Sequence, residues 1–265
     1  DPFWPKPMPN NWVLGQAIGV GVDERDHVWI VHRGDNPANL DTTELAFPPA
    51  RNGLRVSECC IGAPPVIEFD PAGNVVNAWG GPSKTGEYQW PTSNHSIVVD
   101  HKGFVWIGGN GGGDAHILKF TRDGKFVAQF GKADVRQNPP AAGAAPNAAP
   151  TYTANSMDMN NFGRVAKIMI DPKENEGYVA DGYLNHRVAV IDLDTGKIKR
   201  QWGAYGKPPT DEVLGPYDPA APVAQQFRNP VHCAMLSNDG FVYVCDRPND
   251  RVQIFRKDGT FVKEV

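Results

Sequence analysis

The sequence predicts an all-β protein built as a β-propeller. A sequence repeat of four apolar runs, joined by tight polar turns, occurs four times along the chain. The runs are rich in β-branched and aromatic residues and alternate as strands do, and helical periodicity is absent nearly everywhere. Repeated four-stranded units are typical of propeller blades, because each unit completes its core against its neighbours.

The four copies divide the chain into consecutive blades of one domain, residues 1–265. We place the blades at approximately 13–80, 91–131, 162–203 and 228–265. The 28 Gly and 24 Pro suit the many turns that such a chain requires. Six blades are commoner than four for repeats of this kind, so we expect a six-bladed propeller whose last two blades lie outside this chain.

Loop lengths predict which face of the propeller is functional. Turns within the hairpins are short, whereas the long connections all leave the strands on the same side. These connections are residues 34–63, 81–94, 132–165 and 204–231. Long loops on one face of a rigid scaffold usually form the binding face.

Composition excludes several classes of partner. The net charge is −4 and no basic stripe is present, which argues against a nucleic-acid partner. No apolar run approaches the roughly 18 residues of a membrane span. The chain opens at Asp1 with no signal peptide, and we expect a periplasmic or extracellular protein whose signal is not part of this chain.

Four cysteines leave their redox state open. Cys59 and Cys60 are adjacent and form either a vicinal disulfide or two thiols. Cys233 and Cys245 lie on consecutive strands. A two-residue turn at Asn238-Asp239 would point these two thiols to opposite sides of the sheet, whereas one extra residue would bring them opposite each other. Buried thiols and a disulfide are equally compatible with the sequence.

Two histidines occupy equivalent positions in different repeats. The residue five before the first polar turn of each repeat begins the innermost strand, at the mouth of the central tunnel. This column reads Ile18, His95, Ala166 and His232. A single histidine there is more often a satisfied core residue, but two in register predict a metal site. A third histidine from a further blade would complete a three-nitrogen zinc site with an open position.

A second column lies at the end of the next strand, on the same face. It reads Arg33, Asn110, Tyr183 and Arg247. Arginine binds carboxylates with two parallel hydrogen bonds, and a tyrosine close to a metal and to guanidinium groups can act as a base. The set therefore predicts a catalytic pocket for an anionic small molecule or peptide. The alternative for each residue alone is a polar contact with loop carbonyls.

The repeats resemble the NHL family of six-bladed propellers, and among them the peptidyl-α-hydroxyglycine α-amidating lyases. The resemblance runs through LGQAIGVGVDERDHVWIVHRGD, NHSIVVDHKGFVWI, VADGYLNHRVAVIDLDTGKIKRQWG and NPVHCAMLSNDGFVYVCDRPNDRVQIF. Its most specific pieces are HRGD, DGY-x-N-x-R and CDR-x-N-x-R.

The resemblance implies a zinc enzyme. It implies that His95 and His232 bind zinc, that Arg33 and Arg247 are active-site arginines, and that Tyr183 is the catalytic base. It also implies a structural calcium in the tunnel, held by backbone carbonyls near Val20 and Ile97.

Two functions of different class follow. The first is a zinc-dependent lyase that cleaves an N-acyl-α-hydroxyglycine, or a related carbinolamide, to an amide and glyoxylate. The second is a non-catalytic NHL propeller that binds a peptide, a glycan or a protein on its long-loop face. A calcium-dependent lactonase would need carboxylates in the inner column, and the column has none.

Overall fold

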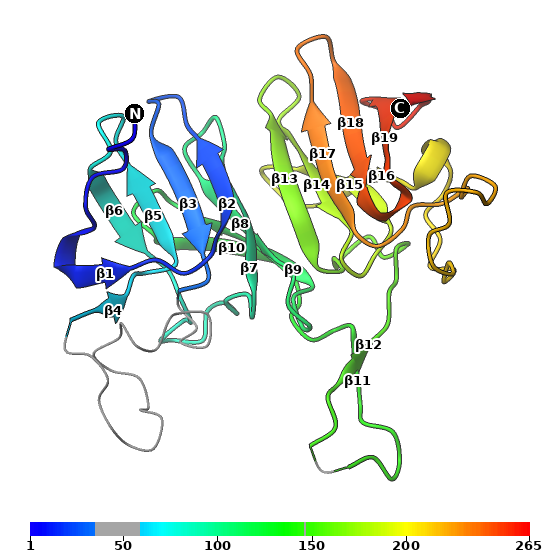
Figure 1. Cartoon of the computed structure of the whole chain (residues 1–265), viewed down its shortest axis with the longest axis horizontal. Helices are drawn as coiled ribbons and strands as arrows, with labels where there is room; N and C mark the ends of the chain where they lie inside the picture. The colour runs from blue at the N-terminus through cyan, green and yellow to red at the C-terminus, as the bar shows by residue number, and fades with distance from the viewer. Residues whose placement is uncertain (35–58, 146) are drawn as a thin grey trace. The chain divides into compact units, whose positions relative to one another are not determined.

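The structure is a computed structural model that describes residues 1–34, 59–145 and 147–265. Within these residues the chain forms four sheets of four strands each, in which neighbouring strands follow one another along the chain (Figure 1). The predicted all-β fold is confirmed, and its repeated four-stranded units are the blades of a β-propeller. Most of the predicted long connection 34–63 lies outside the described residues.

The four sheets are built from successive segments of the chain. The first contains β2 (Ala17–Val22), β3 (Val28–His32), β5 (Val66–Phe69) and β6 (Val75–Trp79), and the second β7 (Asn94–Val99), β8 (Val105–Gly109), β9 (His116–Phe120) and β10 (Phe126–Gly131). The third contains β13 (Val165–Asp171), β14 (Glu176–Asp181), β15 (Arg187–Asp192) and β16 (Ile198–Trp202), and the fourth β17 (Val231–Leu236), β18 (Phe241–Asp246), β19 (Arg251–Arg256) and β20 (Phe261–Glu264).

The remaining elements are short. β1 (Trp12–Val13) pairs with β4 (Ile61–Gly62), and β11 (Gln137–Asn138) pairs with β12 (Thr151–Tyr152) at the base of the Ala- and Pro-rich stretch. The 3₁₀ helices are η1 (Pro9–Asn11), η4 (Ala204–Gly206) and η5 (Arg247–Asn249). No helix in the described part of the chain is long and apolar enough to cross a membrane.

The polar turn of each repeat has a structural cause. The carboxylate of Asp23 accepts hydrogen bonds from the backbone N–H groups of Arg25 and His27 and from the indole of Trp29. Asp100 does the same one blade later, and its indole partner is Trp106 at 2.8 Å. The carboxylate thus satisfies the turn's donors and fixes a buried Trp on the following strand.

Glycine at the end of a turn decides the register of the strands. Ser237 pairs with Phe241, so that three residues rather than two form the turn between β17 and β18. The third of them, Gly240, has a φ of +86°, a conformation that favours glycine. This extra residue places Cys233 directly opposite Cys245.

Both cysteine pairs are therefore disulfides. Cys233 and Cys245 are bonded across the strand pair, with their Cα atoms 4.9 Å apart, and Cys59 is bonded to Cys60. The described residues contain no free cysteine. Of the two alternatives left open by the sequence, the structure has the extra turn residue and the oxidised state.

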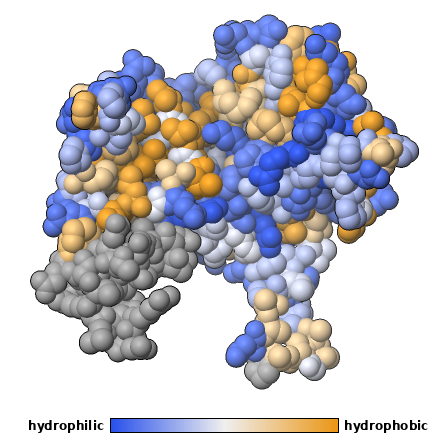
Figure 2. Space-filling model, in the orientation of Figure 1, coloured by the Kyte–Doolittle hydropathy of each residue, from blue (hydrophilic) through white to orange (hydrophobic). Residues whose placement is uncertain are grey.

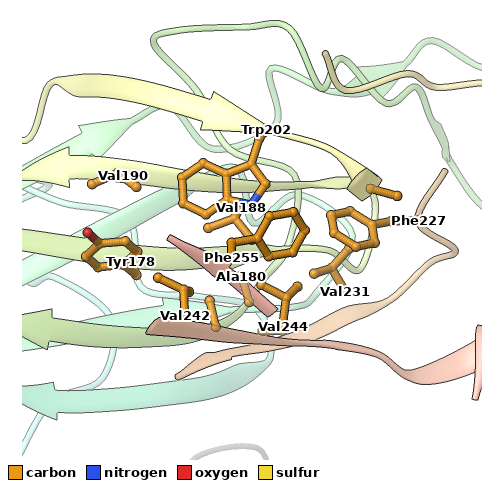
Figure 3. Packing of buried hydrophobic residues seen from close by; sticks show 13 residues of the cluster. Tyr178, Ala180, Val188, Val190, Trp202, Phe227, Val231, Val242, Val244 and Phe255 are labelled. Atoms are coloured by element: carbon orange, nitrogen blue, oxygen red, sulfur yellow. The ribbon is translucent and has the colours of Figure 1, made fainter. Parts of the chain in front are cut away.

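A continuous core joins the third and fourth sheets. Figure 3 shows Tyr178 and Trp202 of the third sheet packed towards Val242, Val244 and Phe255 of the fourth. The rings of Trp202 and Phe255 are 5.8 Å apart. Neither sheet could bury this surface alone, so burial of apolar area stabilises the pairing of the two blades.

The chain divides into two compact units. The first comprises Asp1–Trp90, Asn94–Ile107 and Lys119–Ala128, and the second Pro91–Ser93, Gly108–Leu118 and Gln129–Val265.

On the fourth sheet, in the second unit, large apolar side chains such as Met235, Tyr243 and Val262 are exposed singly. Figure 2 shows hydrophobic side chains interspersed among hydrophilic ones over this sheet.

Candidate active site

His232 lies at a β-bulge on the innermost strand of the fourth sheet. Val231 pairs with Asp246 and Cys233 with Cys245, so that His232 is the extra residue of β17. Ile18 in β2 and Ala166 in β13 are the extra residues at the same position of their sheets. A bulge takes its residue out of the ladder and redirects the side chain. Three members of the histidine column predicted from the sequence, Ile18, Ala166 and His232, are therefore β-bulge residues.

The structure brings three of the predicted residues together in the second unit. Nε2 of His232 lies 3.1 Å from the hydroxyl oxygen of Tyr183, and the two rings meet edge to face with centroids 5.7 Å apart. The guanidinium carbon of Arg247 is 5.9 Å from the centre of the Tyr183 ring. An imidazole, a phenol and a guanidinium thus share one small region, as the two columns predicted.

Electrostatics keep His232 neutral. Burial, together with the positive charges of Arg247 and Lys167, lowers the pKa of its imidazole. The neutral ring is the form that binds a metal ion or accepts a proton. The donor chemistry at this position therefore fits the predicted zinc ligand.

Lys167 was missed by the sequence reasoning. It follows Ala166 on β13, is half-buried, and burial lowers the pKa of its ammonium group. The available signal was a lysine inside an otherwise apolar innermost strand, next to the histidine column. With Arg247 it gives the surroundings of His232 a positive potential that suits an anionic substrate.

A cavity of about 380 Å³ lies beside these residues. Its lining includes His232, Arg247, Cys245 and Val252. Arg247 is exposed and opens η5 directly after β18. A solvent-accessible guanidinium and an imidazole therefore line the same hollow, which is a requirement for a site that binds a small molecule.

Buried carboxylates hold the loops that carry Tyr183 and Arg247. Asp181 accepts hydrogen bonds from the backbone N–H of Gly163 and from the side chains of Asn185 and Arg187, the last at 2.8 Å. Because Asp181 and Arg187 are both fully buried, this clamp fixes the loop on which Tyr183 lies.

Asp246 repeats this clamp in the next blade. Its carboxylate accepts from the backbone N–H of Arg228 and from the side chains of Asn249 and Arg251. The D-x-x-x-N-x-R and D-x-x-N-x-R spacings thus have a positioning role. Asp181 and Asp246 therefore orient the loops that follow β14 and β18.

The first unit holds the other predicted residues. His95 on β7 is buried, with 6% of its surface exposed. Nε of Arg33 donates to the carbonyl oxygen of Asn94 at 3.1 Å, which ties the arginine to the residue before His95. Arg33 is thus bonded to the strand that carries His95.

The strands proposed to hold calcium also pass close together. A Cβ built on Gly19 of β2 would lie 3.1 Å from the backbone nitrogen of Ile97 on β7. Val20 is the next residue of β2. Calcium binding by the carbonyls of Val20 and Ile97 stays a prediction. So does the convergence of His95 and Arg33 with His232, Tyr183 and Arg247, which belong to the second unit.

A different group in the first unit has the spacing of a metal site. Oxygen or nitrogen atoms of Asp23, His27 and Glu68 lie within 4.8 Å of one another. Arg122, however, donates to both carboxylates, and Nδ1 of His27 lies 2.7 Å from Glu68. The guanidinium already supplies the positive charge there, so the group is better explained as an ion-pair network.

The chain is similar in sequence to peptidyl-glycine alpha-amidating monooxygenases. The chain is 25% identical over 256 residues to peptidyl-glycine alpha-amidating monooxygenase B of Xenopus laevis, covering 96% of this chain and 24% of that protein. It is 24% identical over 252 residues to peptidyl-glycine alpha-amidating monooxygenase of Mus musculus, covering 95% of this chain and 22% of that protein. The chain thus spans about a quarter of the length of these relatives.

Neither protein-family models nor solved structures give further information on the function of the chain. A scan against protein-family models found no match. Selenomethionine-substituted virginiamycin B lyase from Staphylococcus aureus overlaps with a TM-score of 0.43 and 11% identity, over 95% of this chain and 70% of that one, which is too loose to bear on function. The repeated four-stranded sheets and this sequence similarity together support an NHL-like β-propeller that is similar to part of the peptidyl-glycine alpha-amidating monooxygenases.

Proposed function

We propose that the protein is a zinc-dependent lyase for N-acyl-α-hydroxyglycines or related carbinolamides. The carbon–nitrogen bond of R–CO–NH–CH(OH)–COO⁻ breaks, the hydroxyl oxygen becomes the aldehyde oxygen of glyoxylate, and the nitrogen gains a proton to give R–CO–NH₂. The observation that carries this proposal is the 3.1 Å contact between His232 and Tyr183, with Arg247 beside the phenol. The similarity to amidating enzymes over almost the whole chain supports it.

The residues fit the proposed metal. His232 is held neutral, and His95 supplies a second imidazole on the corresponding strand of its own sheet. Zinc, when bound, would lower the pKa of the substrate hydroxyl. A structural calcium at Val20 and Ile97 belongs to the same proposal.

Tyr183 has the position of the base. Its phenolate would accept the hydroxyl proton as the carbon–nitrogen bond breaks, and the proton would pass to the departing amide nitrogen. The guanidinium carbon of Arg247 lies 5.9 Å from the centre of the Tyr183 ring, so a positive charge lies beside the proposed base.

The cationic groups also have the position to bind the carboxylate of the substrate. Arg247 presents an exposed guanidinium in the cavity, and Arg33 is the second arginine of the proposal. A guanidinium that holds the carboxylate restricts the orientation of the hydroxyl carbon. It also stabilises the negative charge that develops as the proton leaves.

The two disulfides fit an exported protein. Disulfides persist in oxidising compartments and are rare in the cytosol. We therefore include a periplasmic or extracellular location in the proposal.

The test is glyoxylate release from N-benzoyl-α-hydroxyglycine at neutral pH, corrected for the reaction without protein. We expect Tyr183→Phe to lower kcat by about 10²- to 10⁴-fold, the range for loss of a general base. Tyr243→Phe removes a hydroxyl from an exposed tyrosine of β18 and serves as the matched control. Equal rates for Tyr183→Phe and the wild type would show that Tyr183 is not the general base.

A further inference from the structure

The second unit contains a larger cavity, of about 550 Å³. Several of its lining residues are close in sequence to the residues of the candidate site. Leu184, which follows Tyr183, contributes to its wall, and so does Pro248, which follows Arg247. Asn229 also lines it and is three residues before His232. Each of the three site residues, Tyr183, Arg247 and His232, therefore lies within three positions in the sequence of a residue that lines this cavity.

The lining of the cavity is largely apolar. Eight of its lining residues have aliphatic or aromatic side chains: Tyr152, Ala154, Leu184, Val213, Leu214, Tyr217, Phe227 and Pro248. The volume falls in the range of about 300 to 1,000 Å³ that is typical of sites for organic ligands. It exceeds what a hydroxyglycine unit alone would fill.

Charges on the lining discriminate against anions. Asp211, Glu212 and Arg228 are charged residues of the lining, and the carboxylate of Asp211 accepts hydrogen bonds from Ser156. Arg228 already donates to the carbonyl oxygen of Gly215 and to the side-chain oxygen of Asn249. A negatively charged group in the cavity would therefore meet two residues of like charge, while Arg228 is engaged elsewhere and Nδ1 of His186 lies 3.5 Å from Asp211.

We propose that this cavity is the subsite for the acyl side of the substrate, and that it selects a peptide whose residue before the hydroxyglycine is apolar and uncharged. The inference rests on the proposed lyase function, because it places the N–CH(OH) bond of the hydroxyglycine, which is the bond that breaks, at Tyr183. Tyr152, Tyr217 and Phe227 provide aromatic surface, so an aromatic residue fits best.

The kinetic test compares four substrates that differ only in the acyl group. They are the α-hydroxyglycine conjugates of N-acetyl-phenylalanine, N-acetyl-alanine, N-acetyl-glutamate and hexanoic acid. We expect kcat/KM for the phenylalanine substrate to exceed that for the alanine substrate at least about tenfold, the factor that corresponds to burying an aromatic side chain. The glutamate substrate is expected to be the poorest, and the hexanoyl substrate to fall below the phenylalanine one. A hexanoyl substrate better than the phenylalanine one would overturn the choice of a peptide.

Two variants assign the preference to the cavity. Leu214→Ala truncates a half-buried side chain of the lining and should reduce the ratio between the phenylalanine and alanine substrates by about three- to tenfold. Val223→Ala makes a similar truncation at a side chain of the same connection that is 57% exposed and lies outside this lining. It should leave the ratio unchanged. An unchanged ratio in Leu214→Ala would refute the assignment.

A binding measurement separates this inference from the lyase proposal. N-acetyl-Phe-Gly and N-acetyl-Ala-Gly lack the hydroxyl group, and calorimetry measures their binding without turnover. Tighter binding of the phenylalanine peptide, with a difference that Leu214→Ala reduces, supports the subsite even if no substrate releases glyoxylate. Glyoxylate release with equal kcat/KM for all four substrates upholds the lyase and overturns the subsite.

Discussion

The imidazole of His232 and the phenol of Tyr183 meet at 3.1 Å although 49 residues separate them. Tyr183 lies in the loop after β14 of the third sheet, and His232 lies at the bulge of β17 in the fourth. The contact therefore depends on the packing of two blades as well as on the local geometry of each. It links the hydrophobic core of Figure 3 to the chemistry of the site.

Removing the imidazole should remove a metal ligand. We expect His232→Ala to weaken zinc binding by more than about 100-fold, because even changes to the partners of a ligand cost 10- to 100-fold. His101→Ala, at an exposed turn residue, is the control. Zinc content measured by mass spectrometry after dialysis against a graded series of chelator concentrations reports the loss. Identical zinc retention by His232→Ala and the wild type would exclude His232 as a ligand.

Arg247→Lys tests carboxylate recognition. Lysine keeps the positive charge but cannot form two parallel hydrogen bonds to a carboxylate. We expect KM for N-benzoyl-α-hydroxyglycine to rise about tenfold, with a smaller change in kcat. Arg256→Lys, at an exposed position of β19, should leave both constants unchanged. If the two variants behave alike, Arg247 does not hold the substrate.

Loss of the disulfide beside His232 should lower stability. The Cys233–Cys245 bond closes a loop with a sequence separation of 12, and the chain-entropy model assigns about 3 kcal/mol to a loop of this size. We expect the double variant Cys233→Ala, Cys245→Ala to lose about this free energy of unfolding in a urea titration. A loss below about 0.5 kcal/mol would show that the strand pair needs no covalent link.

Asp181→Asn should destabilise the protein strongly. The change leaves the fully buried guanidinium of Arg187 without its carboxylate, and removal of one partner from a buried ion pair costs about 3 to 5 kcal/mol. Glu174→Gln, at an exposed turn, should stay within about 0.5 kcal/mol of the wild type. Both values come from urea titrations at neutral pH. Equal stability of the two variants would mean that the clamp is dispensable.

Stability should fall in acid because of Glu176. Burial opposes ionisation of this carboxyl group, but hydrogen bonds from Arg200 and Lys199 outweigh burial and lower its pKa to about 2. The unfolded chain binds the proton first as the pH falls, so the stabilisation is present above pH 4.5 and disappears towards pH 2. It amounts to on the order of 2 to 3 kcal/mol.

The control variant for the acid dependence is Glu176→Gln, because a glutamine side chain does not titrate. We expect its unfolding free energy to depend less on pH between 4.5 and 2 than that of the wild type. Parallel pH profiles for the two proteins would show that Glu176 has no depressed pKa.

Much of the fold was predictable from local patterns. The alternation of apolar and polar residues and the short turns predicted the four strands of each repeat. Register was harder to predict. The left-handed Gly240 and the bulge at His232 each shift pairing by one residue, and neither changes the alternation enough to be seen in one sequence.

The candidate site was predictable only in part. The histidine and arginine–tyrosine columns could be found because repeats place equivalent residues at equivalent points, and Tyr183, His232 and Arg247 do lie together. Lys167 and the 550 Å³ cavity could not be found this way. A lysine becomes part of the site through burial against neighbouring strands, and the cavity is formed by irregular connections that have no repeat.

Identification of the products tests the central claim most directly. N-benzoyl-α-hydroxyglycine is incubated with the zinc-supplemented protein, and the mixture is analysed by mass spectrometry. The account predicts benzamide and glyoxylate in equal amounts, formed faster than without protein and suppressed by a chelator. Benzoate in place of benzamide, or no turnover by folded protein that retains zinc, would contradict it and favour a hydrolase or a binding propeller instead.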